Sequence, residues 1–237
     1  MSTEYLIFNF IVLIGPVLAS FDRHVCFFSK WKSAWLAITI VAIPFIAWDA
    51  LVTGRHWRFS SVYTIGVKIF ELPVEECLFF FTVPFASVFV WEVVKHYFPI
   101  HTGKTTTVIS LLVSLMWMPG IYFAFTGKEY TAFALMALSV SFFIDLFLKT
   151  TITVQKRFYT FLGLTSIFML IFNGYLTARP VVMYDAAYQL DWRVGTIPIE
   201  DFIYGYALIV SVIVVYEKLI SHSHEIKKQP SNAARGD

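Results

Sequence analysis

The chain has little charge. Only 14% of its 237 residues are charged, against about 25% in a typical soluble domain. Apolar residues make up 58% of the chain, and the mean hydropathy is +0.69. Because these residues gather into long runs, the composition excludes an ordinary soluble domain and predicts a protein that crosses a membrane several times. The net charge of +2 gives no reason to expect nucleic acid as a partner.

Several functional signatures are also missing from the sequence. It has no glycine-rich nucleotide-binding loop, so we expect no nucleotide cofactor. Its six histidines lack metal-ligand spacing, so we expect no metal. The last apolar run has no lysine near its middle, which excludes a retinal Schiff base, and no arrangement of Ser, His and Asp indicates hydrolysis. The only cysteines, Cys26 and Cys77, fall near opposite membrane faces and are not expected to pair.

Seven apolar runs are long enough to span a bilayer. In lipid each segment must satisfy its own backbone hydrogen bonds, so we expect these runs to be helices. They lie at residues 4–20, 34–51, 73–94, 106–125, 129–148, 157–178 and 198–220. The polar segment 221–237 is expected to be a disordered cytoplasmic tail. The predicted fold class is therefore an all-α integral membrane protein with seven transmembrane helices.

The two halves of the sequence repeat each other. The stretch PVEE at 73–76 falls on PIED at 198–201 with an offset of 125 residues (198 minus 73), and this offset also superposes the first three helices on the last three. We predict a first three-helix unit at 1–97, a linking helix at 98–128 and a second unit at 129–220. Four crossings separate equivalent helices, so the units should be parallel about a pseudo-twofold axis along the membrane normal.

The distribution of lysine and arginine predicts the orientation of the chain. The loops on one face carry six of these residues and those on the other face carry twelve. The smaller set is Arg55, Arg58, Lys68, Lys128, Arg179 and Arg193. Since cytoplasmic loops are enriched in positive charge, we expect a multi-pass protein of the cell membrane with its N-terminus outside and its C-terminus in the cytoplasm.

Two adjacent acids follow the proline of each repeated motif: Glu75 and Glu76 in the first, Glu200 and Asp201 in the second. Proline and acids suit the first turn of a helix, so a single motif could be no more than a good helix start. Two copies beside one axis favour a function. Adjacent helical residues point about 100° apart, so one acid of each motif can face the bundle centre, and we expect Glu75 and Glu200 first. Facing carboxyl groups in a dry site supply an acid and a base for catalysis.

Four further residues are candidates for contact with a substrate. Phe79 and Tyr204 lie in the runs that follow the acids. Asp49, near the outer end of the second helix, is either a third acid of the site or an interfacial helix end. Asn173 is a candidate hydrogen-bond donor to a motif carboxylate, or to another helix.

With LPVEECLFF and TIPIEDFIY, seven apolar helices and a duplicated unit, the sequence resembles the integral-membrane lycopene cyclases. It is similar to the fused form of this family, whose motif is P-x-E-[ED], over nearly all of the chain. The resemblance implies cyclisation of the ψ-ends of lycopene to β-rings, giving γ-carotene and then β-carotene, without a flavin. It also implies lycopene and related acyclic carotenoids as substrates, membrane lipid as the surroundings, and an association with other carotenoid enzymes.

The chemistry of this cyclisation agrees with the residues. The reaction is a redox-neutral isomerisation in which a proton is added and another is lost, so an acid, a base and a site that excludes water suffice. The alternative is a small membrane carrier of the same 3+1+3 plan whose acids couple protons. A carrier for a hydrophilic solute should have polar groups through its full depth. The segments 79–90 and 203–215 have few, which favours the cyclase.

Overall fold

Helices account for most of the structure. The computed structural model describes residues 2–233, with side chains described through Ser223. Its α-helices are α1 (Glu4–Ala19), α2 (Trp31–Val52), α3 (Val74–Tyr97), α4 (Lys104–Ser114), α5 (Trp117–Phe125), α6 (Glu129–Leu148), α7 (Lys156–Ala178) and α8 (Ile199–Ala233). Its strands are β1 (Trp57–Phe59), β2 (Lys68–Ile69), β3 (Leu72–Pro73), β4 (Val182–Tyr184), β5 (Arg193–Val194) and β6 (Ile197–Pro198). Two 3-10 helices, η1 (Phe27–Lys30) and η2 (Ala186–Tyr188), complete the elements.

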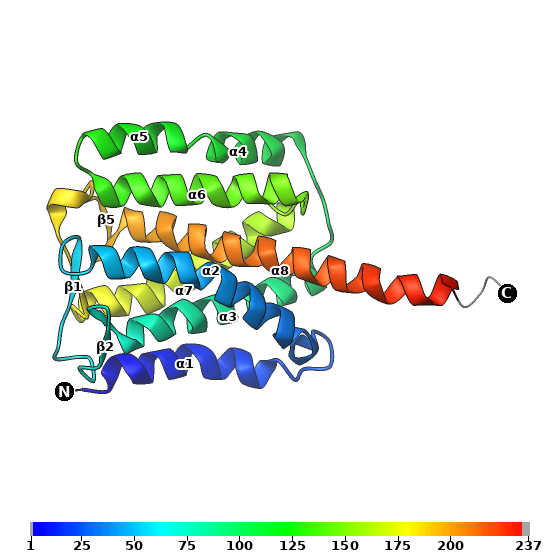
Figure 1. Ribbon diagram of the computed structural model, residues 1–237, viewed down its shortest axis with the longest axis horizontal. Coiled ribbons are helices and arrows are strands. Elements are labelled where there is room, and N and C mark those ends of the chain that lie inside the picture. Colours follow the sequence, from blue (N-terminus) through cyan, green and yellow to red (C-terminus); the bar gives the residue numbers. More distant parts are fainter. Residues whose placement is uncertain (1, 234–237) are drawn as a thin grey trace.

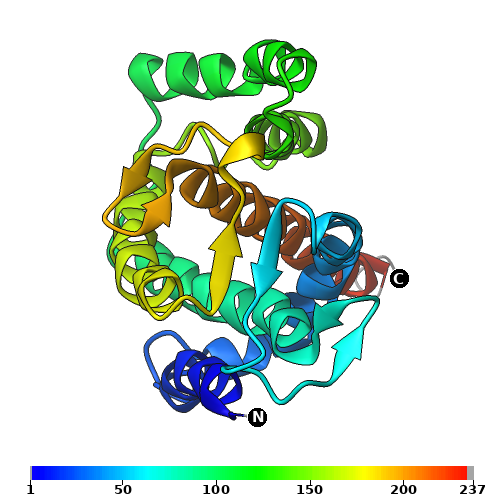
Figure 2. The same ribbon diagram turned by 90° about the vertical axis from the view of Figure 1, so that its left-hand side faces the viewer.

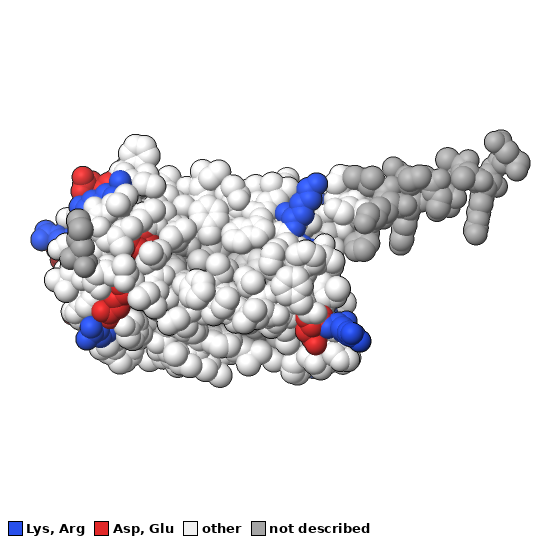
Figure 3. All heavy atoms as spheres, turned by 90° about the horizontal axis from the view of Figure 1, so that it is seen from below, with Lys and Arg blue, Asp and Glu red and all other residues white. Residues whose placement is uncertain are grey.

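The helices have the length and composition of membrane spans. Within the described residues, six segments are long and apolar enough to cross a bilayer, and α1 is a shorter apolar helix of 16 residues. On the face shown in Figure 3, charged side chains gather toward the two ends and leave an uncharged band between them. The predicted fold class, an all-α membrane protein with its apolar helical segments in a 3+1+3 order, is confirmed.

The linking span differs from a single helix. It is divided into α4 and α5, which meet at a turn over residues 115–116. Pro119 lies in the first turn of α5 and has no N–H for the carbonyl of Leu115, with which its ring would also clash in a continuous helix. The interruption therefore follows from this proline, and the two short helices run one after the other along one edge of the molecule (Figure 1).

The last helix also differs from its expected extent. The segment 221–237 was expected to be disordered, but α8 continues to Ala233, beyond the body of the molecule (Figure 1). Residues 234–237 of the expected tail lie outside the described residues.

The internal repeat is visible in the positions of six elements in each half. Three helices and three strands of the first half each have a counterpart that begins 125 residues later (129 minus 4). The paired starts are 4 and 129, 31 and 156, 57 and 182, 68 and 193, 72 and 197, and 74 and 199. Equivalent strands β1 and β4 pair antiparallel, with Arg58 opposite its own equivalent, Met183. A local twofold axis therefore passes between these two residues.

The repeats pack around α3 and α8 with unequal closeness. α1 packs on α3, and its equivalent α6 packs on α8, while α5 lies over the outer side of α6 and α4 extends to one side of it (Figure 2). α2 packs closely against both α3 and α8. Its equivalent α7 packs less closely against α3 and least against α8. This looser packing of α7 leaves room for the cavity described next.

Candidate active site

A small roof of strands closes one end of the bundle. β1 and β4 lie side by side at the centre of this end (Figure 2), and the short hairpins β2–β3 and β5–β6 lead directly into α3 and α8. Pro73 and Pro198 each end a hairpin one residue before the helix begins. Because both acid motifs occupy the first turn of these helices, the roof places them at the same end of the molecule.

An elongated cavity of about 490 Å³ begins beneath this roof. α1, α3, α7 and α8 form its walls, and α2, α6, β1 and β4 contribute residues only at the roofed end. On α3 the lining runs from Glu76 to Val90, a length of about 21 Å at 1.5 Å per residue. The lining away from the roof is apolar apart from Ser87 and Thr165. The shape suits a long apolar molecule with one end at the polar roof.

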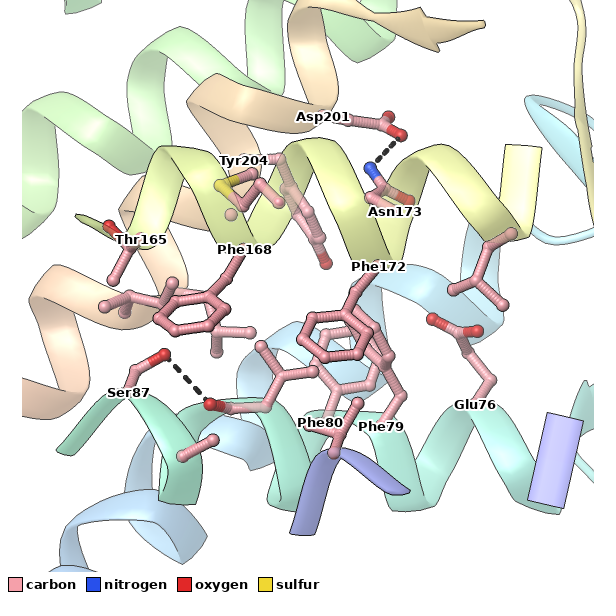
Figure 4. A pocket seen from close by; sticks show the side chains of 18 of the residues that line it. Glu76, Phe79, Phe80, Ser87, Thr165, Phe168, Phe172, Asn173, Asp201 and Tyr204 are labelled. Carbon is pink, nitrogen blue, oxygen red and sulfur yellow. Dashed lines mark hydrogen bonds between the residues drawn. The ribbon is translucent and has the colours of Figure 1, made fainter. Parts of the chain in front are cut away.

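Three carboxyl groups line the roofed end of the cavity: Glu76, Asp201 and Asp49. Glu76 and Asp201 come from the two repeats, and in Figure 4 they lie at the same end of the cavity on opposite sides of it. The hydroxyl of Tyr5 donates a hydrogen bond to Glu76. The indole N–H of Trp57 donates to Asp49 Oδ1 at 2.6 Å, and Asp49 Oδ2 has no partner among the described residues.

Asp201 accepts the largest number of hydrogen bonds of the three. Tyr130 and Asn173 donate to it at 2.6 and 2.8 Å, and Tyr184 donates at 2.7 Å. Burial, followed by the charge of Asp201, raises the pKa of the Tyr184 phenol well above its ordinary value. Tyr184 therefore stays a hydrogen-bond donor across the physiological pH range. Three donors together stabilise the carboxylate form of Asp201.

The other acid of each motif supports the roof. Glu75 and Glu200 are fully buried and do not line the cavity. Glu75 Oε1 accepts from the backbone N–H of Ile65 at 2.6 Å, and Glu200 Oε1 accepts from that of Leu190 at 2.7 Å and from the Thr131 hydroxyl at 2.6 Å. The expectation that these two acids face a shared cavity is therefore wrong. The motifs do meet at one cavity, but through Glu76 and Asp201.

The sequence reasoning missed the tyrosines that hold the cavity acids. Tyr5 donates to Glu76, and Tyr130 donates to Asp201. The offset of 125 residues relates the two tyrosines as it relates the two acids (130 minus 5, 201 minus 76). This shared offset was the available signal, and it shows that each repeat contributes one matched tyrosine–acid pair.

All four residues proposed for substrate contact line the cavity: Phe79, Tyr204, Asp49 and Asn173. Asn173 reaches Asp201, as the dashed line in Figure 4 marks. The hydroxyl of Tyr204 is buried and has no protein partner among the described residues. In Figure 4 its ring reaches into the space between α7 and α3, so it is placed to contact a bound molecule.

The electrostatics of the roofed end favour proton sharing. Among the residues that the structure describes, no lysine or arginine lines the cavity. Three carboxylates without a cation in a low-dielectric space repel one another, so at least one of the groups keeps a proton. Glu76 and Asp201 lie at the positive ends of their helix dipoles, whereas Asp49 lies in the last turn of α2, at the negative end. Among the side chains described, at residues 2–223, no group of three His, Cys, Asp or Glu is arranged to hold a metal ion.

Comparison with known proteins gave one match. The family model described as lycopene cyclase matches the chain twice, over residues 2–94 and 127–219, once in each repeat. No curated protein and no solved structure gave a significant match.

Proposed function

Because the chain belongs to the lycopene cyclase family, we propose that it converts the ψ-ends of lycopene to β-rings, giving γ-carotene and then β-carotene. The observation that supports this best is the pair Glu76 and Asp201, one from each repeat, at the end of a long apolar cavity. A carotenoid polyene is a long apolar rod whose reactive carbons lie at its ends. Such a molecule fits with its chain along the helices and its end among the acids.

The hydrogen bonds of the two acids support one as the proton donor and the other as the proton acceptor. Glu76, which has a single donor, delivers a proton to C2 of the ψ-end. The C5=C6 double bond then attacks the cation at C1, which forms the C1–C6 bond and moves the positive charge to C5. Asp201, held as a carboxylate by three donors, accepts the proton from C6, and the electrons of that C–H bond form the new C5=C6 bond. The balance is an isomerisation with no net gain of protons.

Other cavity residues protect the cation. Phe79, Phe80 and Phe172 surround the space next to the acids, and the faces of such rings attract a cation by about 0.5–2 kcal/mol per contact. The strand roof excludes water, which would otherwise trap the cation as an alcohol. Asp49 holds a further proton beside the pair, since it lies at the negative end of a helix and has one unpartnered oxygen.

We expect deuterium from heavy water to enter the new ring. Membranes that contain only this chain and lycopene, with no added flavin or nicotinamide, should form cyclic carotenes that carry one deuterium at C2 for each ring. The reason is that the proton on Glu76 exchanges with solvent between turnovers. Mass spectrometry of the separated pigments measures the label. Cyclic product without label, or turnover that requires a reduced cofactor, would contradict the proton-transfer scheme.

Removing the tyrosine hydroxyls should affect the two repeats unequally. Tyr5→Phe removes the one donor of Glu76, whereas Tyr130→Phe leaves Asp201 with two others. A hydrogen bond to a charged group contributes about 1.5–3 kcal/mol, so we expect a loss of turnover of about tenfold or more for Tyr5→Phe and a smaller loss for Tyr130→Phe. Initial rates at equal amounts of folded protein measure both. Equal losses would show that the donors do not set the roles of the acids.

We also propose that the roofed end faces outward, with the N-terminus outside and the C-terminus in the cytoplasm. The support is the distribution of Lys and Arg in the sequence, where six belong to the loops assigned to the side of the motifs and twelve to the opposite side.

A further inference from the structure

We infer that the carotenoid enters the cavity sideways from the lipid, through an opening between α1 and α7, and that only this half of the pseudo-symmetric molecule holds a substrate end. The inference rests on the proposed function, because it takes a carotenoid as the occupant. It adds the route of entry and the number of working sites per chain.

The cavity wall is open between α1 and α7. Ile11 of α1 and Phe168 of α7 both line the cavity, yet these residues are 55% and 46% exposed, so the wall that they form is not closed. Gly15, one turn after Ile11, also lines the cavity and is exposed, and a Cβ added there would meet no atom within 4 Å. Since these residues lie within apolar helices, the opening faces lipid tails.

The same two helices are joined at the roofed end. The Arg179 guanidinium pairs with Glu4 at 3.0 and 3.2 Å, and the Tyr175 hydroxyl donates to Glu4 at 2.5 Å. The rings of Phe8 and Tyr175 stack with centroids 6.1 Å apart. These contacts close the gap between α1 and α7 on the side of the water. A carotenoid is held in lipid, so the remaining opening is also where the substrate is present.

The equivalent place in the second repeat is filled. There Trp48 stacks on Phe133 with centroids 3.8 Å apart and planes 3° from parallel. Trp48 is the counterpart of Asn173 (173 minus 48 is 125), and Phe133 is the counterpart of Phe8. α2 also packs closely on both central helices, where its counterpart α7 does not. The repeats have therefore diverged into one open half and one packed half.

Because only one half of the molecule is open to lipid, one ring forms each time a carotenoid binds. A polyene that lies along the α7 side can present one end to the acids, and its other end points away from the roof. The monocyclic product must then leave through the opening and return with its second end first.

The test introduces a bulky side chain at the opening and at its counterpart. Gly15→Trp fills the gap, and Val140→Trp changes the equivalent position of α6, where the side chain is 53% exposed. Both positions are exposed, so both variants should fold, which gel filtration in detergent verifies. We expect Gly15→Trp to reduce turnover by about tenfold or more, because the indole would occupy the gap through which the carotenoid enters, and Val140→Trp to leave it unchanged.

Lycopene retention separates this inference from the proposed chemistry. The same two substitutions, made in a chain that also has Glu76→Gln, are purified from a lycopene-containing host, and the bound pigment is measured by absorbance. Less lycopene with Gly15→Trp, and an unchanged amount with Val140→Trp, supports the opening even in a chain that makes no ring. Unchanged retention with Gly15→Trp, or equal losses with both, overturns it.

A pulse of labelled lycopene followed by an excess of unlabelled lycopene tests the single site. We expect labelled monocyclic carotene to accumulate, because it is released and then competes with the excess. If the label instead passes directly into bicyclic carotene, without being diluted by the unlabelled lycopene, the monocyclic carotene is not released. That result would overturn the inference that one ring forms each time a carotenoid binds.

Discussion

Glu76→Gln and Asp201→Asn should each reduce cyclisation by at least about 10²-fold, the usual contribution of a general acid or base. Both substitutions preserve the shape of the side chain but replace one carboxyl oxygen by an amide NH2, which removes the proton-transfer group from the cavity wall. The two variants should also differ in the products that they form. Without the acid, no deuterium enters lycopene. Without the base, the cation loses a proton from another carbon, so the small remaining product should shift away from the β-ring. Chromatography of pigments from a lycopene-accumulating host measures both effects.

Two exposed acids near the motifs serve as controls. Glu71→Gln and Asp191→Asn remove charge at the same end of the molecule, but their side chains are 77% and 52% exposed and outside the cavity. We expect both to retain normal turnover. Near-normal pigment from either cavity variant, at equal expression, would remove that residue from the mechanism.

Glu200→Ala should produce the largest loss of stability among the motif variants, whereas Glu200→Gln should be tolerated. Alanine leaves the Leu190 N–H and the Thr131 hydroxyl without their acceptor, and an unsatisfied buried donor costs about 1–3 kcal/mol. With two such donors, the free energy of unfolding should therefore fall by about 2–6 kcal/mol. Glutamine keeps an oxygen for both donors. Thermal unfolding in detergent, followed with turnover per folded molecule, measures the difference.

Glu75 supplies the matched case in the first repeat. It accepts only the Ile65 N–H through Oε1, so Glu75→Ala should destabilise the chain less than Glu200→Ala. If Glu75→Gln or Glu200→Gln folds normally and still loses turnover as strongly as Glu76→Gln, the proton chemistry belongs to the buried acids and the assignment made here fails.

The sequence was sufficient for most of the spans, for the repeat and for the position of both acid motifs at one end of the molecule. Apolar runs reveal membrane helices, and an ungapped offset of 125 residues places PVEE and PIED together without any knowledge of packing. The sequence was not sufficient to decide which acid of the first motif, Glu75 or Glu76, faces the cavity. That choice depends on a rotation of about 100° about the helix axis, which is set by how α3 packs against α1 and how the hairpin β2–β3 enters the helix.

The hydrogen-bond partners of the acids and the one-sided cavity needed coordinates for the same reason. Tyr130 and Tyr184 reach Asp201 from separate elements, and a roof formed by β1 and β4 was not expected in a chain of long apolar runs. The repeat suggests two equal halves. The difference between Trp48 and Asn173 is visible in the sequence, but its effect on packing is visible only in the structure.

The linking helices α4 and α5 pack on α6, and neither contributes a side chain to the described cavity lining. Instead, they connect the two repeats covalently. Two separate halves would meet by diffusion in the bilayer, and the fraction assembled would depend on how much of each was made. A tether makes the encounter intramolecular, with an effective concentration of about millimolar for a short linker. Every folded chain then carries a whole site with both acids, whatever its expression level.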